Sequence, residues 1–222
     1  MSWNSFMLSA IAAICTIILG LVLAYGKRLV KTPSVQKAVR LSGLGYAMPG
    51  AVLAVGVIIP LAAFDNAVDR WFESWFGIST GLLLSGTVFA LIFAYVVRFL
   101  AVSAGSIESS LDKVTPSMDM AARSLGYNTL QILWKVHVPM IKPGVLTAAL
   151  VVFVDSMKEL PATLVLRPFN FDTLATHVYQ FASDELLEES ALAALVIVLV
   201  GVVPVVLLSR SIIASRNETV EG

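Results

Sequence analysis

The stretch FMLSAIAAICTIILGLVLAY, residues 6–25, decides the fold class because it contains no ionised side chain over its whole length. A helix of about 20 apolar residues crosses the roughly 30 Å hydrocarbon core of a bilayer. In lipid, every backbone amide and carbonyl of such a segment must be satisfied within the segment, which makes it a helix. The sequence therefore predicts that the chain begins with a membrane-spanning helix.

Four further apolar runs follow, in a chain of 222 residues that is 58% hydrophobic and 14% charged. This composition is too apolar for an ordinary soluble domain. We therefore predict an all-α polytopic membrane protein with a single transmembrane domain over residues 1–222 and about five spans. The spans are expected at approximately residues 5–26, 41–64, 79–102, 144–166 and 186–209.

The distribution of Lys and Arg predicts the orientation of the spans. The first and third connections are rich in basic residues, whereas the second and fourth carry mostly acidic ones. Basic connections stay on the cytoplasmic side. The N-terminus is therefore expected outside, and the first connection, the third connection (residues 103–143) and the C-terminus are expected in the cytoplasm. The formal net charge of zero gives no indication of nucleic-acid binding.

The third connection contains MDMAARSLGYNTLQILWKVHVPM, residues 118–140, which has the pattern of two short helices. Gly126 suits the left-handed position that ends the first helix. Asn128 is expected to cap the second helix, with Gln131 as the partner in a capping box, and Pro139 is expected to end it. A glycine-centred pair of helices would form a compact cytoplasmic knob for a soluble partner. An amphipathic loop on the membrane surface is the alternative.

These residues resemble permease subunits of binding-protein-dependent ABC importers, whose cytoplasmic loop follows the pattern E-A-A-x3-G-x9-I-x-L-P. Met120 stands at the glutamate position, beside Asp119. The resemblance implies a type I importer permease (MetI-like) core and a coupling helix that docks on an ATPase subunit. The matching or adjacent residues expected in this coupling loop are Asp119, Ala121, Ala122, Gly126 and Pro139.

Two further stretches, GYAMPGAVLAVGVIIPL (45–61) and residues 153–185, look like the ferric-iron branch of these permeases. Thiamine, phosphonate and polyamine permeases share parts of both, so these cargoes remain open. The chain resembles the C-terminal half of a two-half permease. The resemblance implies a bacterial inner-membrane location, and its partners would be ABC ATPase subunits, a periplasmic binding protein, and a second permease half or a second copy.

No nucleotide-binding loop is present. The nearest approach to G-x4-G-K-[ST], residues 20–28, has five intervening residues and ends in Lys-Arg. We therefore expect a transport subunit that is not itself an enzyme and binds no cofactor, with ATP used by a partner subunit. An ATP-independent secondary carrier and a non-transporting membrane scaffold are the rival classes.

Three charged residues, Asp155, Lys158 and Glu159, fall inside the fourth predicted span. Ionisable groups at that depth are costly unless they pair or face water. Their i, i+3, i+4 spacing predicts one shared helix face, just before Pro161. They are candidates for a translocation path that suits a hard cation, or alternatively for structural ion pairs with neighbouring spans. No metal site is predicted, because His177 has no second ligand at helical spacing.

Overall fold

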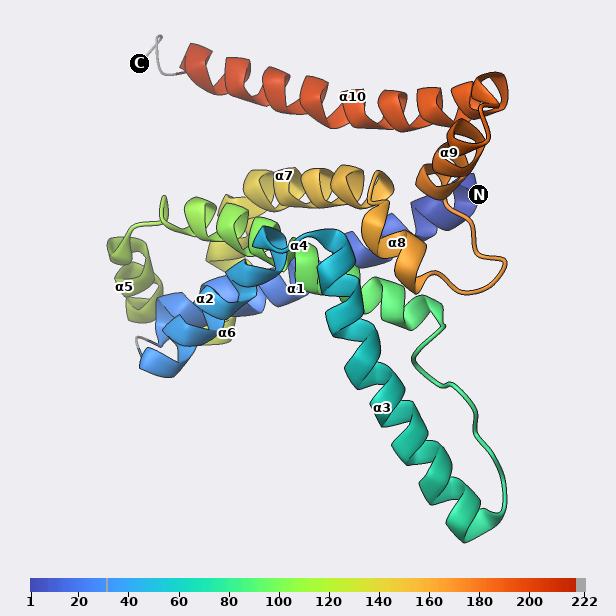
Figure 1. Cartoon of the computed structure of the whole chain (residues 1–222). Helices are drawn as coiled ribbons and strands as arrows, with labels where there is room; N and C mark the ends of the chain where they lie inside the picture. The colour runs from blue at the N-terminus through green and yellow to red at the C-terminus, as the bar shows by residue number, and fades with distance from the viewer. Residues whose placement is uncertain (31, 219–222) are drawn as a thin grey trace.

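The computed structural model describes residues 1–30 and 32–218, with side chains described as far as Val202 and at Val206. Within that part every regular element is helical, which confirms the predicted class (Figure 1). The elements are α1 Ser2–Leu29, α2 Pro33–Ala47, α3 Gly50–Phe76, α4 Val88–Leu111, α5 Pro116–Ser124, α6 Thr129–Ile132, the π-helix η1 Leu133–His137, α7 Val138–Met157, α8 Pro161–Leu166, α9 Leu174–Ser183 and α10 Leu187–Glu218.

Four helical segments are long and apolar enough to cross a membrane. They are Ser2–Leu29, Gly50–Phe76, Val88–Leu111 and Thr129–Met157, the last of which joins α6, η1 and α7. The fifth predicted span, residues 186–209, lies in α10 except for its first residue, and α10 is a helix of 32 residues. Most side chains of α10 beyond Val202 lie outside the described part, so the membrane crossing of this helix stays a prediction.

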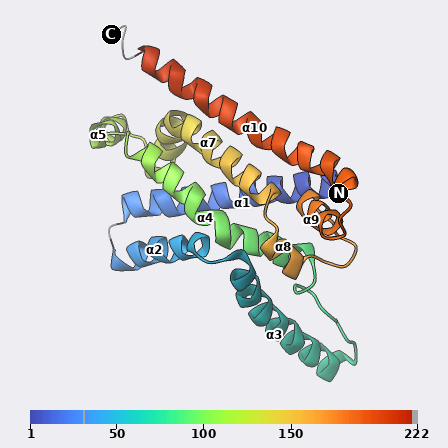
Figure 2. The same cartoon turned by 45° about the horizontal axis from the view of Figure 1, so that its top comes forward.

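The helices α1, α4 and α7 pack side by side and form the core, with α2 alongside α4 (Figure 1, Figure 2). Small residues such as Ala12, Ala94 and Ala148 are fully buried where these helices meet. A Cβ added at Gly144 of α7 would lie 1.8 Å from Oγ of Ser110 in α4. Small side chains let helices approach closely in lipid, where packing rather than the hydrophobic effect holds them together.

The second predicted span, residues 41–64, is wrong in its boundaries because the helix breaks inside it. α2 ends at Ala47, and α3 starts at Gly50 and runs on to Phe76. Pro49 has no amide to continue a helix and favours an extended backbone at the residue before it. Met48 is indeed extended, with ψ of 140°.

The third predicted span, residues 79–102, begins too early, because its first part is not helical. The segment between α3 and α4 is irregular, and Gly77, Gly81 and Gly86 within it take positive φ values of 65°, 62° and 74°. The helix starts only at Val88. Left-handed glycines are typical of turns, which explains why an apolar composition did not produce a helix there.

Two carboxylates of α3 hold this irregular segment. Asp65, which is fully buried, accepts hydrogen bonds from the amides of Leu84 (3.0 Å) and Ser85 (2.7 Å) and from the Ser85 hydroxyl (2.5 Å). Asp69, one turn later, accepts from the amide of Thr80 (2.7 Å). The spacing of four residues puts both carboxylates on one helix face. Side chains therefore supply the acceptors that a helix would have supplied internally.

The fourth predicted span, residues 144–166, is two helices rather than one. α7 ends at Met157 and α8 begins at Pro161, because proline has no amide to donate to the Met157 carbonyl. At the other end α7 starts at Val138 and α4 runs on to Leu111. The connection predicted at residues 103–143 therefore shrinks to residues 112–137.

We predict that Asp65→Ala releases the segment between α3 and α4 while leaving the bundle of α1, α4 and α7 intact. The amides of Leu84 and Ser85 lose their acceptor, so their hydrogen exchange should become faster in the purified protein, measured by mass spectrometry. Glu73→Ala, at an exposed position of the same helix, is the matched control and should change nothing. Unchanged exchange at Leu84 and Ser85 in Asp65→Ala would contradict this role.

Candidate functional site

The connection between α4 and α7 contains the predicted helix–glycine–helix element. Gly126 has φ of +82° and follows Leu125, the C-cap residue of α5. Its amide donates to the carbonyl of Arg123 (2.9 Å), and the amide of Tyr127 donates to the carbonyl of Ala122 (3.1 Å). This pair of bonds is the Schellman arrangement, in which a left-handed residue closes a helix. The local prediction for Gly126 is confirmed.

The second helix begins where predicted but does not end where predicted. The side chain of Asn128 accepts from the amide of Gln131, and Gln131 accepts from the amide of Asn128, both at 2.9 Å, which confirms the capping box. Pro139 does not end the helix, because the chain stays helical over Thr129–Met157. The missing amide of Pro139 disrupts bonding to the Lys135 carbonyl, and the wider π-turn directly before α7 accommodates it.

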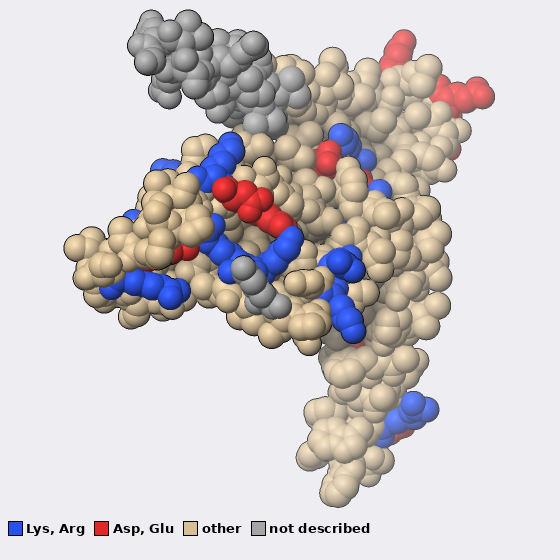
Figure 3. Space-filling view, turned by 90° about the vertical axis from the view of Figure 1, so that its left-hand side faces the viewer, with Lys and Arg blue, Asp and Glu red and all other residues tan. Residues whose placement is uncertain are grey.

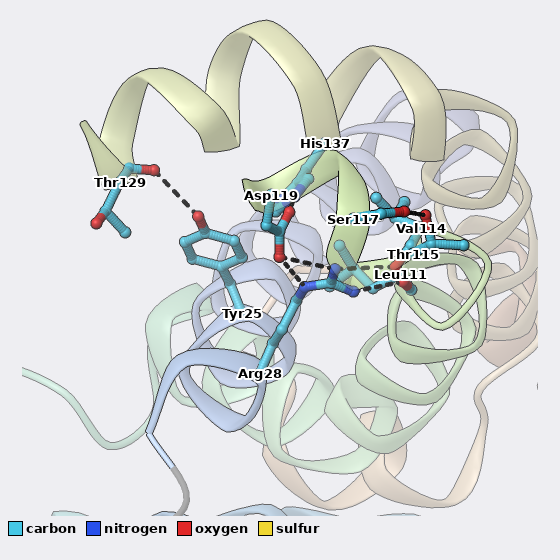
Figure 4. Close-up of polar contacts among 9 residues, drawn as sticks. All are labelled: Tyr25, Arg28, Leu111, Val114, Thr115, Ser117, Asp119, Thr129 and His137. Atoms are coloured by element: carbon cyan, nitrogen blue, oxygen red, sulfur yellow. Dashed lines mark hydrogen bonds and ion pairs between the residues drawn. The ribbon is translucent and has the colours of Figure 1, made fainter. Parts of the chain in front are cut away.

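Asp119 lies at the centre of a polar cluster that joins three elements (Figure 4). Its Oδ1 lies 2.5 Å from Nε2 of His137 in η1. Its Oδ2 accepts from Nη2 (2.9 Å) and Nε (3.3 Å) of Arg28, in the last turn of α1. One carboxylate of α5 thus holds together segments that are far apart in the sequence.

The end of α1 makes further bonds to the same region (Figure 4). Nη1 of Arg28 donates to the carbonyl of Leu111 (2.8 Å), and Nη2 donates to that of Val114 (2.9 Å), directly after α4. The hydroxyl of Tyr25 donates to the carbonyl of Thr129 at the start of α6 (3.0 Å). The helix–glycine–helix element is therefore fastened to α1 at both of its helices.

The surroundings of Asp119 favour its charged form. Partial burial acts to raise the pKa of this carboxyl, but the hydrogen bonds from Arg28 and His137 and their positive charge outweigh it. The pKa of Asp119 therefore lies below its usual range. The carboxylate is ionised at neutral pH and available as an acceptor for both partners.

The outer surface of the element carries exposed apolar side chains. Ala122 is buried, whereas Ala121 is exposed, and Met120, Leu125 and Leu130 are each more than 60% exposed. Figure 3 shows this end of the molecule, where Lys and Arg side chains gather. Exposed cations of α2, the α4–α5 connection, α5, η1 and α7 are Lys37, Arg40, Lys113, Arg123, Lys135 and Lys142. An apolar knob among cations is a surface suited to a soluble partner.

The three charges predicted to share one helix face do not do so. Lys158 pairs with Asp155 at 2.9 Å, and the Lys158 side chain is 59% exposed. Glu159 lies beyond the end of α7 and is buried, with Oε2 placed 3.0 Å from Nε of Arg98 in α4. The helical spacing fails because α7 has already ended at Met157.

Arg98 also reaches the other helix break. Its Nη1 donates to the carbonyl of Met48, between α2 and α3, at 2.8 Å. Beside it, Tyr95 donates to the backbone carbonyl of Glu159 at 3.2 Å. A Cβ added at Gly50 would lie 2.5 Å from Oε1 of Glu159, so the two breaks are in close contact.

Sequence reasoning did not identify Arg28, His137 and Arg98 as parts of these clusters. Arg28 lies in the basic first connection, and Arg98 falls inside the third predicted span, with no partner predicted for either. A signal for Arg98 was present, since it directly follows a long charge-free run and so falls within a helix rather than in a connection. No sequence signal pairs His137 with Asp119, because the π-turn sets the direction of that side chain.

No group of three or more His, Cys, Asp or Glu side chains that could hold a metal ion occurs in the part of the chain that the structure describes. Near the end of α7 there are two separate ion pairs, Asp155 with the exposed Lys158 and the buried Glu159 with Arg98.

Curated relatives resemble most of this chain. An Fe(3+)-transport system permease protein, FbpB 2, of Haemophilus influenzae is 30% identical over 93% of this chain, which covers 38% of the relative. The ferric transport system permease protein FbpB of Actinobacillus pleuropneumoniae is 26% identical over 86% of this chain and 28% of its own length. The molybdenum transport system permease protein ModB of Haemophilus influenzae is 27% identical over 50% of this chain and 48% of its own. The chain thus spans less than half the length of each of these relatives.

A solved structure has the same fold. A chain of the MetNI methionine ABC transporter, in an inward-facing conformation, superposes with a TM-score of 0.65 at 16% identity, over 94% of this chain and 93% of that one. The expected MetI-like fold is thereby confirmed. The sequence model of the family described as binding-protein-dependent transport system inner membrane component matches residues 16–217. The chain belongs to this family.

Proposed function

We propose that this chain is a permease subunit, or half of one, of an ATP-driven importer that moves ferric iron across the bacterial inner membrane. The family match over residues 16–217, with the fastened helix–glycine–helix element inside it, carries the importer class. The iron assignment is supported by relatives named for ferric transport and by the stretches at residues 45–61 and 153–185.

The proposed coupling contact is the surface of α5 and α6. The exposed side chains of Met120, Leu125 and Leu130 would enter a groove of the ATPase subunit, with Gly126 setting the turn between the helices. Asp119 would pass the movement on, because its bonds to Arg28 and His137 tie α5 to α1 and to the segment that continues into α7. ATP would be bound and hydrolysed by the partner alone.

The proposed orientation places the N-terminus outside and the C-terminus in the cytoplasm, with the α5 end of the molecule on the cytoplasmic side. The basic residues gathered at that end support this orientation. A periplasmic binding protein would then deliver cargo at the opposite end. A second permease half or a second copy would complete the path through the lipid membrane.

Of the three candidate path residues, Asp155 and Lys158 fit the path best, because the Lys158 side chain is largely exposed. Glu159 is sealed against Arg98, so we assign it to the structure of the helix breaks. A carboxylate such as Asp155 suits a hard trivalent cation in transit. The relative named for molybdenum transport supports a different cargo as the second candidate within the same importer class.

We predict that Gly126→Pro abolishes binding of the ATPase subunit. Proline fixes φ near −65°, which is incompatible with the φ of +82° at this position. Native mass spectrometry of the chain co-expressed with the ATPase and permease genes of its own operon should show the ATPase with wild type and lose it with the variant. Gly77→Pro, which imposes the same constraint after α3, should keep the ATPase. Retention by Gly126→Pro would contradict the coupling assignment.

We predict that Arg28→Gln loosens α5 and shifts its loss of structure on acidification to higher pH. A carboxyl with a lowered pKa contributes stability above its unfolded pKa, and this contribution is lost as the pH falls through the folded pKa. Removal of Arg28 raises the folded pKa of Asp119 toward its usual value, so the loss should begin earlier in an acid titration. Hydrogen exchange of residues 116–124 against pH measures the shift, with Lys37→Gln, an exposed cation of α2, as control.

We predict that vesicles containing the assembled transporter accumulate radioactive ferric iron when ATP and the operon's own binding protein are both present. Uptake without ATP would contradict the importer class and favour a secondary carrier. ATP-driven uptake of molybdate in place of iron would support the importer class but contradict iron as the cargo.

An Arg28→Gln transporter should bind the ATPase but take up iron more slowly than wild type, because α5 no longer moves with α1.

A further inference from the structure

Two helix breaks meet beside the middle of α4 (Figure 2). One separates α2 from α3 at Met48 and Pro49, and the other separates α7 from α8 around Glu159. Arg98 contacts both of them, through the carbonyl of Met48 (2.8 Å) and the carboxylate of Glu159 (3.0 Å). No other cation in the part of the chain that the structure describes pairs with Glu159.

The pair is costly to keep in a membrane helix bundle. The side chain of Arg98 is 19% exposed and that of Glu159 only 7%. Taking two charges out of water carries a desolvation cost that their attraction only partly offsets, and an apolar pair of similar volume is often at least as stable. Simple packing therefore does not require this pair. The Arg98 guanidinium uses different atoms for the two breaks, because Nη1 hydrogen-bonds the Met48 carbonyl while Nε forms an ion pair with the Glu159 carboxylate.

The contact leaves no free space on the α3 side. Gly50 is the first residue of α3, and an added Cβ there would lie 2.5 Å from Oε1 of Glu159 and 3.3 Å from Pro161. The α3 start therefore rests directly on the α7–α8 break. A shift of Glu159 cannot occur without a shift of α3 or a loss of the contact.

We propose that Arg98 is a positioning residue that makes the two helix breaks move as one unit. This proposal rests on the proposed function. The helical segment Thr129–Met157 runs without interruption from the coupling element to the α7–α8 break. Movement of the coupling element therefore reaches Glu159 directly, and Arg98 transfers it to Met48 and the start of α3, so that α3 and α8 are repositioned together during transport.

Two measurements test this role of Arg98, hydrogen exchange of the two breaks and iron uptake by the assembled transporter. In the purified chain in lipid nanodiscs, Arg98→Gln should speed hydrogen exchange in two peptides at once, residues 46–54 and 156–164. Lys158→Gln is the matched control, since it removes the ion pair between Asp155 and the exposed Lys158 at the same break. It should leave the hydrogen exchange of residues 46–54 unchanged. In the assembled transporter, Arg98→Gln should keep the ATPase but lower iron uptake per complex roughly fivefold or more.

Two further variants keep the test decisive if Arg98→Gln fails to fold. Gly50→Ala changes no charge but pushes on the Glu159 carboxylate, so it should loosen both peptides in the same way. Arg98→Lys keeps a positive charge beside Glu159 but removes the Nη1 donor that bonds the Met48 carbonyl. It should therefore protect residues 156–164 while leaving residues 46–54 fast in exchange.

A response confined to one break in both Arg98→Gln and Gly50→Ala would overturn the link. A response of both breaks with normal uptake per complex would overturn the positioning role, although it would leave the importer function intact. If the wild-type transporter itself takes up no iron, the proposed cargo has failed, and the exchange measurement still decides whether Arg98 joins the breaks.

Discussion

A backbone group that a helix break leaves without a partner in its own helix must be bonded by another group wherever water is excluded, and several charged side chains of this chain meet that need. Charged side chains bond the backbone at three such interruptions. Asp65 accepts the amides of the segment before α4, Arg98 donates to the Met48 carbonyl, and Arg28 donates to the carbonyls at the end of α4. These charges complete the backbone, and those of Asp65, Arg98 and Arg28 also join segments that are distant in sequence.

The features that the sequence predicted are those that depend on local chemistry. Runs without ionised residues gave the helical membrane class, and Gly126 with the Asn128–Gln131 box gave the turn between α5 and α6. Such signals act over a few neighbouring residues, so they can be recognised in a single amino-acid sequence. The resemblance to the family pattern around Ala121 and Ala122 added the importer class. Periodicity alone would have left two interpretations of this connection, a knob that binds a soluble partner and an amphipathic loop on the membrane surface.

The features that it did not predict depend on contacts between distant segments. Hydropathy extended the second span through Pro49 and the third into the turns before Val88, because an apolar turn and an apolar helix have the same composition. Glu159 was assigned to the face of Asp155 because helical spacing was assumed to continue beyond Met157. Its partner Arg98 is 61 positions earlier in the chain, a separation that no periodicity reveals.

The π-turn at Leu133–His137 has a consequence for comparing related chains. A π-turn contains one residue more than the α-helical turn it replaces, so every side chain after it is rotated by about 100° relative to an uninterrupted helix. A protein built without that extra residue would aim a different side chain at Asp119. In an alignment, a single-residue gap at this place would therefore indicate that a residue other than the equivalent of His137 pairs with Asp119, and not merely that the helix is shorter.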